Sequence, residues 1–425
     1  MALGIFLFSL AGFMFLGMPI AFALVLTGIT LMWHLDFFDA QLVAQNLING
    51  ADSFPLMAVP FFILAGEVMN AGGISKRIIN LAISCVGHRR GGLGYVAIIA
   101  AVILASLSGS AIADTAALAT LLLPMMRNNG YPIGRSAGLI AAGGIIAPII
   151  PPSMPFIIFG VTANQSISKL FMAGIVPGII MGLGLVLAWK WSMKTVDVEP
   201  QPRQSIKTRL KVAKDGFFAL LMPVIIIGGL RGGLFTPTEA AVIAAGYAMI
   251  ISLLVYRELK IADLIPLFIQ AAYTTSIVMF LCAAAIVSSY MVTLADLPAE
   301  LISFLEPIMD SPRTLMATIV IVMLLIGMVM DLTPTILILA PVTIPLIIKA
   351  GIDPIYFGVM FIMVGCVGLI TPPVGTVLSV VSSVAKEPLE KITRGILPFL
   401  FAYMAIIVLF VIFPEIITVP AKLLY

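Results

Sequence analysis

Three serine hydroxyls and a glycine interrupt an otherwise apolar stretch of this 425-residue chain. Ser106, Ser108 and Ser110 alternate along the sequence, and Gly109 separates the last two. A glycine lets the backbone leave a helix, and the freed carbonyls can join the hydroxyls in an oxygen cage for a hard cation such as Na⁺. Close helix packing through small residues explains such a run equally well. The segment is therefore a candidate ion site, with packing as the alternative.

Two pairs of consecutive prolines form the second candidate site. Pro151-Pro152 follows Gly143-Gly144, and Pro372-Pro373 follows Gly368. Each pair removes two amide donors, so carbonyls before it lose their helical partners. In hydrocarbon this is costly unless an ion, a water or another segment satisfies those carbonyls. One such break could be a structural kink, but the same break at two places favours a pair of ion sites.

An isolated carboxylate is the third candidate. Asp331 is the only charged residue between Arg313 and Lys349. A carboxylate inside an apolar run is a functional candidate by default, because its burial is costly. It could accept hydrogen bonds from a substrate or balance a cation, and it could also cap the helix that follows. Asp114 and Glu239 carry the same ambiguity, since both also resemble residues of a helix start.

Membrane-spanning helices must position these residues. Hydrophobic residues make up 61% of the chain and charged residues only 10%, whereas a soluble domain carries about 25% charged residues. Residues 136–168 and 354–385 contain no charge, and each stretch exceeds the roughly 20 residues that cross a bilayer. The composition predicts an all-α polytopic membrane protein.

The apolar pattern predicts where the helices lie. Two segments, 108–126 and 332–348, are too polar or too rich in proline for simple spans, so we expect re-entrant or broken helices there. Residues 35–49 favour either an interfacial helix or a plain surface loop. Simple helices are expected at about 2–33, 54–71, 91–106, 137–147, 153–164, 170–192, 217–231, 238–256, 266–293, 314–330, 355–368, 374–385 and 396–418.

The two halves of the chain repeat one another. A shift of 221 positions superimposes seven glycines and prolines, where chance would give roughly one or two. In an apolar chain such a duplication is typical of transporters, whose sites lie where the copies meet. The same shift places Ser110 on Asp331, so the copies differ where a substrate must break the symmetry. The matched pairs are Pro124 and Pro345, Gly130 and Gly351, Gly144 and Gly365, Pro151-Pro152 and Pro372-Pro373, Gly174 and Gly395, and Pro177 and Pro398.

A basic linker divides the two copies. Residues 1–193 form the first repeat, residues 194–215 the linker and residues 216–425 the second repeat. The excess of lysine and arginine predicts that the linker is cytoplasmic, with the turn at 88–90 and the segment 257–260 on the same face or near it.

Enzymatic chemistry finds no support in the sequence. It contains two histidines and no HExxH, GxSxG or Walker motif, so we expect no catalysis and no nucleotide site. The net charge of +3 does not indicate a nucleic-acid partner. Energy for transport would then come from an ion gradient or from a partner protein.

Five segments resemble the large membrane subunit of TRAP (tripartite ATP-independent periplasmic) transporters, and the similarity extends over the whole chain. The resemblance implies two inverted repeats with re-entrant hairpins and broken helices, in which a transport domain moves as an elevator against a scaffold. It also implies a multi-pass protein in the lipid bilayer of a bacterial inner membrane. The matching segments are Ala105–Ala117, Ala141–Ser153, Gly233–Ala241, Gly327–Pro334 and Gly368–Gly375.

The resemblance further implies partners, a coupling ion and a substrate class. The family works with a small membrane subunit and a periplasmic substrate-binding protein, and it imports organic acids by Na⁺ symport. Sialic acid or a related sugar acid is expected first, and a C4-dicarboxylate next. The residues implied are Ser106, Gly144, Ala147 and Ile150 for one Na⁺ site, Gly327, Gly368, Thr371 and Val374 for the other, and Ser108, Ser110, Ser153 and Asp331 for the substrate.

Two other functions stay open at this point. A self-sufficient ion-coupled carrier of organic anions with a similar fold would need no binding protein. A membrane assembly subunit without transport activity is the other, although such a protein has no use for two ion-site breaks.

Overall fold

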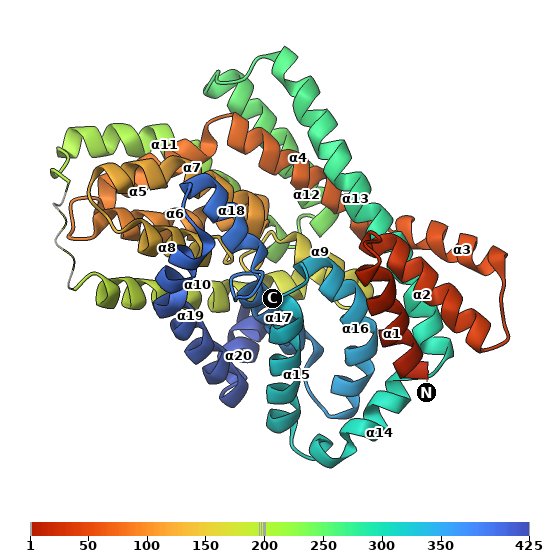
Figure 1. The fold of residues 1–425 in the computed structure, drawn as a ribbon. Helices are drawn as coiled ribbons and strands as arrows, with labels where there is room; N and C mark the ends of the chain where they lie inside the picture. Colours follow the sequence, from red (N-terminus) through yellow and green to blue (C-terminus); the bar gives the residue numbers. More distant parts are fainter. Residues whose placement is uncertain (1, 195, 197, 199–200, 425) are drawn as a thin grey trace.

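The computed structural model describes residues 2–194, 196, 198 and 201–424. In this part of the chain all regular secondary structure is helical, and there is no strand (Figure 1). The side chains of residues 107 and 108 also lie outside the description. Within the described residues, six helical segments are long and apolar enough to cross a membrane. The fold is therefore that of an all-α polytopic membrane protein, as the composition predicts.

The first half contains one break more than the sequence predicts. The single helix expected over residues 2–33 is wrong, because the chain turns between Phe15 and Ile20, where Gly17 has a φ of 80° and Pro19 lacks an amide donor. The two resulting helices pack side by side (Figure 1). The helices are α1 (Ala2–Phe15), α2 (Ile20–His34), α3 (Ala40–Ala51), the 3₁₀ turn η1 (Phe54–Met57), α4 (Ala58–Ala71), α5 (Ile74–Val86), α6 (Gly92–Ser108), α7 (Ala111–Asn128), α8 (Ile133–Gly144), α9 (Met154–Thr162) and α10 (Ile167–Ser192).

Of the two alternatives for residues 35–49, a helix or a surface loop, the structure shows a helix from Ala40 onward. The Asp39 carboxylate accepts hydrogen bonds from the amides of Gln41, at 2.7 Å, and Leu42, at 3.3 Å, and so caps α3. The structure does not test whether α3 lies at the membrane interface.

The second half begins earlier than expected, inside the basic linker. Ser205 Oγ accepts a hydrogen bond from the Thr208 amide at 3.1 Å, and this cap starts a helix eleven residues before the predicted start. The helices are α11 (Ile206–Arg231), α12 (Pro237–Ile250), the π-helical turn η2 (Ile251–Val255), α13 (Ile261–Leu294), α14 (Leu297–Met309), α15 (Pro312–Gly327), α16 (Leu332–Lys349), α17 (Pro354–Gly368), α18 (Thr376–Ala385), α19 (Leu389–Ile412) and α20 (Glu415–Leu424).

Helix bounds follow the shift of 221 positions found in the sequence. It carries α7 onto α16 residue for residue, and it carries α6, α8, α9 and α10 onto α15, α17, α18 and α19 to within a few residues. The expected re-entrant segments 108–126 and 332–348 correspond to α7 and α16, which are helical despite the internal Pro124, Pro341 and Pro345. An inverted relation between the two copies stays a prediction.

The two copies pack crosswise around a buried centre. Helix α7 packs against α18 of the other half, and α16 packs correspondingly against α9. Helix α17 lies in the middle (Figure 1), with every residue from Tyr356 to Gly368 buried. Helix α8 meets α19, where Tyr403 Oη donates a 2.6 Å hydrogen bond to the carbonyl of Ala142. Neither copy could bury these surfaces alone.

A second body of helices surrounds one side of this centre. Helix α4 packs against α12, α5 packs against α11, and α2 and α3 pack against the long helix α13. These helices come from outside the repeated segments α6–α10 and α15–α19. The family resemblance does not assign the scaffold to particular residues, and these helices belong to the part of the described chain outside the duplicated unit.

Hydrogen bonds and an ion pair connect the basic segments to neighbouring parts of the chain. Arg90 donates to the carbonyl of Val196 in the linker at 3.2 Å, and Arg77 pairs with Glu258 at 3.0 Å. Burial and the nearby Arg209 lower the pKa of His88 in the α5–α6 turn. The turn and the linker therefore lie close together, and the segment after η2 contacts the start of α5. Their cytoplasmic orientation stays a prediction.

The α8–α19 contact yields a test of this packing. We expect Gly138→Ala to destabilise the protein by about 1–3 kcal/mol, because its new Cβ would lie 2.8 Å from backbone atoms of Gly395 and Ile396. Gly246→Ala is the matched control, since a Cβ there meets no described atom within 4 Å. It should be neutral or stabilising by up to about 1 kcal/mol. Thermal melting in detergent measures both, and equal melting temperatures for the two variants would contradict the packing.

Candidate functional site

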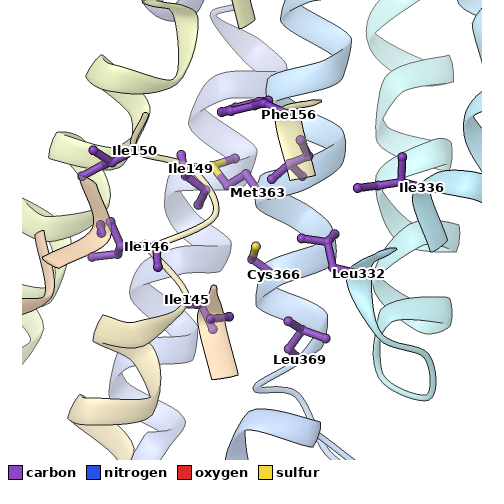
Figure 2. Packing of buried hydrophobic residues seen from close by; sticks show 14 of the residues in the cluster. Ile145, Ile146, Ile149, Ile150, Phe156, Leu332, Ile336, Met363, Cys366 and Leu369 are labelled. Carbon is purple, nitrogen blue, oxygen red and sulfur yellow. The ribbon is translucent and has the colours of Figure 1, made fainter. Parts of the chain in front are cut away.

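Two irregular segments lie at corresponding positions of the two halves. Residues 145–153 separate α8 from α9, and residues 369–375 separate α17 from α18. Each contains its proline pair, and the peptide bond between the two prolines is cis in both. Figure 2 shows Ile145 and Ile149 of the first break on one side of α17, and Leu332 of α16 on the other. The first break therefore lies in the buried centre of the molecule, whereas the second lies at its edge, where Pro373 and Val374 are exposed.

A small cavity of about 70 Å³ joins the two halves next to the first break. Ser110 and Asp331, which occupy the same position in the two repeats, both line it. The cavity wall also includes Pro148 of the first break, Leu369 of the second and Val278 of α13. The structure thus brings together two of the four residues predicted to bind substrate.

Three helices begin at this cavity. Helix α7 starts after Ser110, α9 starts at Met154 and α16 starts after Asp331, and all three of these residues line the cavity. A helix N-terminus carries a partial positive charge and amide hydrogens without helical partners. Three such ends around one cavity form an environment that favours a negatively charged group.

The Asp331 side chain does not serve as the cap of its helix. Asp331 occupies the N-cap position of α16, where its side chain makes no N-cap hydrogen bond and interacts instead with the backbone amide of the next residue, Leu332. The first-turn hydrogen bond runs instead from Thr335 Oγ1 to the backbone carbonyl of Asp331, at 2.8 Å. Ser110, by contrast, caps α7 by accepting from the Ala113 amide at 3.3 Å. The Asp331 carboxylate is therefore available to accept hydrogen bonds from a bound molecule.

A larger cleft of about 590 Å³ lies against the same carboxylate. It is lined by Pro19, which precedes α2, by Phe22 of α2, by Tyr273 and Ser276 of α13, and by Asp331. Its volume falls within the range of about 300–1,000 Å³ that is typical of small-molecule sites. Because it shares Asp331 with the small cavity, this cleft gives a solute room to approach the three helix starts.

The remaining predicted substrate residues are placed differently. Ser153 is fully buried behind the cavity wall, where its hydroxyl donates to the carbonyl of Pro148 and accepts from the Phe156 amide. Its hydrogen bonds hold the start of α9 in place. The side chain of Ser108 lies outside the described part of the structure, so nothing is stated of its contacts.

The residues predicted for the first Na⁺ site surround the end of α8. Gly144 is the last residue of α8, and its carbonyl accepts from the Ala147 amide at 3.2 Å. Ile150 lies further along the same break. Ser106 is buried on α6, which packs against α8, and its hydroxyl donates to the carbonyl of Ile103 at 2.6 Å.

The residues predicted for the second Na⁺ site meet where two helices end. Gly327 ends α15 and Gly368 ends α17, and a Cβ built on Gly368 would lie 2.6 Å from Gly327 Cα. The Thr371 amide donates to the Gly368 carbonyl at 2.9 Å, while Val374 is partly exposed. Helix C-termini present partially negative carbonyl oxygens, which are suitable ligands for a hard cation. Both sets of residues therefore fit Na⁺.

The ambiguous acidic residues also resolve differently. Glu239 completes a capping box with Thr236, whose amide donates to Glu239 Oε2 at 2.7 Å, so it is a residue of a helix start. Asp114 is buried in the first turn of α7 with only 3% of its surface exposed. Thr115, the next residue, is not among the predicted site residues, and neither is any residue of α13, whose Val278 carries no polar signal.

Helix ends of opposite polarity around the packed core of the two repeats define a class of protein. Carbonyl-bearing ends at the two breaks and amide-bearing ends at the Asp331 cavity, inside a bundle of apolar helices, are the architecture of membrane transporters with broken helices. The family model of the tripartite ATP-independent periplasmic transporter, DctM component, matches residues 7–416. The chain belongs to this family, the large permease subunits of TRAP transporters.

Individual relatives agree with the family model. The chain is 56% identical to the 2,3-diketo-L-gulonate TRAP transporter large permease protein YiaN of Escherichia coli, over 99% of both chains. It is 37% identical to the sialic acid TRAP transporter large permease protein SiaM of Vibrio cholerae, over 96% of both. It is 35% identical to the C4-dicarboxylate large permease DctM of Pseudomonas aeruginosa, over 88% of both.

A distant solved structure shares the fold. The Alcanivorax borkumensis YdaH transporter, described as having an unusual topology, superimposes with a TM-score of 0.64 over 88% of each chain, at 14% sequence identity. This likeness concerns the fold alone. Family membership gives the chain a transport role in a membrane. TRAP systems in general also include a small membrane subunit and a periplasmic binding protein.

The geometry around Asp331 yields a paired test. Asp331→Ala should lower solute uptake at least about tenfold, since it removes a charged hydrogen-bond acceptor, while changing stability by less than about 0.5 kcal/mol. Asp353→Ala is the matched control, because Asp353 caps α17 with bonds of 2.7 Å and 3.2 Å to the amides of Ile355 and Tyr356. It should cost about 1 kcal/mol and leave uptake per folded protein unchanged.

Uptake into proteoliposomes and thermal melting separate the two effects. Normal uptake by Asp331→Ala would show that this carboxylate is not part of the substrate site.

Proposed function

We propose that this chain forms the transmembrane path of a Na⁺-coupled importer for a hydroxylated sugar acid that a periplasmic binding protein delivers. The observation that carries the proposal is the cavity in which three helix starts surround Ser110 and the Asp331 carboxylate. A bound acid would place its carboxylate toward the amide-bearing helix ends. Its hydroxyl groups would donate hydrogen bonds to Asp331.

Na⁺ coupling is supported by the two breaks. The α8 and α17 ends present carbonyl oxygens at the two breaks, and each lies one short segment away from the acid cavity. Na⁺ supplies positive charge there, which the site needs because the acid and Asp331 are both negative. A solute that binds only together with Na⁺ is driven by the Na⁺ gradient.

The substrate class follows from the chemistry of Asp331 and from the relatives. A dicarboxylate without hydroxyl groups offers Asp331 no donor, whereas a sugar acid offers several. The relative that shares 56% identity is named for 2,3-diketo-L-gulonate, and the relative named for sialic acid shares 37%. A six-carbon sugar acid is therefore our first candidate, and sialic acid the second.

The movement we propose is an elevator. The crosswise unit α6–α10 with α15–α19 would carry the cavity and both breaks as one body. The outer helices α2, α4 and α13 would stay fixed in the membrane. The cleft between α13 and Asp331 lies along the boundary between these two bodies.

Reconstituted transport tests the proposal. Proteoliposomes containing this chain and its small membrane subunit should accumulate labelled 2,3-diketo-L-gulonate under an inward Na⁺ gradient when the binding protein is present. Replacing Na⁺ by choline, or omitting the binding protein, should each reduce uptake to background. Sialic acid and succinate serve as competitors that identify the substrate class.

Each alternative function has its own outcome. Gradient-driven uptake without the binding protein would indicate a self-sufficient carrier. A complex that assembles but accumulates none of the acids would indicate an assembly subunit.

A further inference from the structure

The hydroxyl group of Thr115 is one of four buried helical threonine hydroxyls without a hydrogen-bond partner among the described residues; the others are those of Thr27, Thr275 and Thr376. Thr120, Thr335 and Thr343 each donate to the carbonyl four residues earlier, at 2.7–2.8 Å. Thr115 is fully buried on α7, and its Oγ1 has no hydrogen-bond partner among the described residues. A buried hydroxyl without a partner is destabilising, so such an atom calls for an explanation.

This oxygen faces the first break. Thr115 Oγ1 lies against Gly144, the last residue of α8, so closely that a Cβ built on Gly144 would overlap it. Gly144 is one of the residues that frame the proposed first Na⁺ site. The missing side chain at Gly144 therefore leaves room for the Thr115 oxygen beside the last residue of α8.

The second break has no such oxygen. The shift of 221 positions carries Gly144 onto Gly365 and Thr115 onto Ile336. A Cβ on Gly365 would lie 2.5 Å from Leu332 Cδ1, and Figure 2 shows Leu332 and Ile336 together on α16 beside α17. Hydrocarbon thus occupies the region where the first break presents a hydroxyl. The two breaks share their backbone but differ in this side chain.

We infer that Thr115 Oγ1 is a side-chain ligand for Na⁺ at the first break, and that the second break lacks an equivalent ligand. The inference rests on the proposed Na⁺ coupling and names a residue that completes one of its sites. Hydroxyl oxygens are suitable ligands for hard cations. Na⁺ would also satisfy the lone pairs of a group that has no partner without it.

Three variants test the inference. Thr115→Val keeps the shape and removes the oxygen, Thr115→Ser keeps the oxygen, and Thr343→Val removes a buried hydroxyl that is bonded within its own helix. The complex with the small membrane subunit is purified for each, and ²²Na⁺ binding and thermal melting are measured while NaCl replaces choline chloride.

Thr115→Val should weaken one component of Na⁺ binding by at least about tenfold, and Thr115→Ser and Thr343→Val should bind like the parent. In choline, Thr115→Val should melt no lower than the parent, because it loses only an unsatisfied hydroxyl. A purely structural threonine would instead lower the melting temperature equally with and without Na⁺.

The failures are distinguishable. Unchanged Na⁺ binding by Thr115→Val, with normal binding by the parent, overturns the Thr115 inference and leaves Na⁺ coupling intact. A parent complex that binds no Na⁺ overturns the coupling, and the inference with it.

Discussion

The backbone at the two breaks imposes the constraint on which the rest of the structure depends. Proline pairs interrupt the chain after α8 and α17, and the carbonyl groups at these helix ends need partners that hydrocarbon does not provide. Short turns supply some of these partners, namely the amides of Ala147 and Thr371. Every neighbouring feature answers this need. The copies pack crosswise to exclude water and lipid, small residues bring the α15 and α17 ends into contact, and the opposite helix ends assemble around Asp331. Structure and function share this one requirement.

The two copies solve the same backbone problem with different side chains. Ser110 and Asp331 stand at equivalent positions and line one cavity, yet one caps its helix and the other leaves its carboxylate uncapped. Thr115 and Ile336 form a second unequal pair. Under our proposal, duplication supplies two frameworks for ions, and these substitutions suit the interior to a single asymmetric solute.

Much of this could be predicted from the sequence, because glycine and proline act locally. The breaks, the repeat and the isolated Asp331 all follow from residue types and spacing, and the helix bounds obey the predicted shift. Other features depend on contacts between distant segments. Hydropathy alone did not predict the turn after α1 or the helices α5 and α14, which contain charged residues. Nothing in the sequence around Thr115 shows that its hydroxyl contacts Gly144.

We propose that the acid lies at the helix starts beside Asp331 while Na⁺ lies at the helix ends of the breaks. An electron cryomicroscopy structure of the complex with 2,3-diketo-L-gulonate in NaCl tests it most directly, with a choline chloride structure as the reference. The account predicts density for the acid between Ser110 and Asp331, and Na⁺-dependent density beside Gly144 and Gly368. Acid density elsewhere, or breaks that look identical in the two salts, would contradict it.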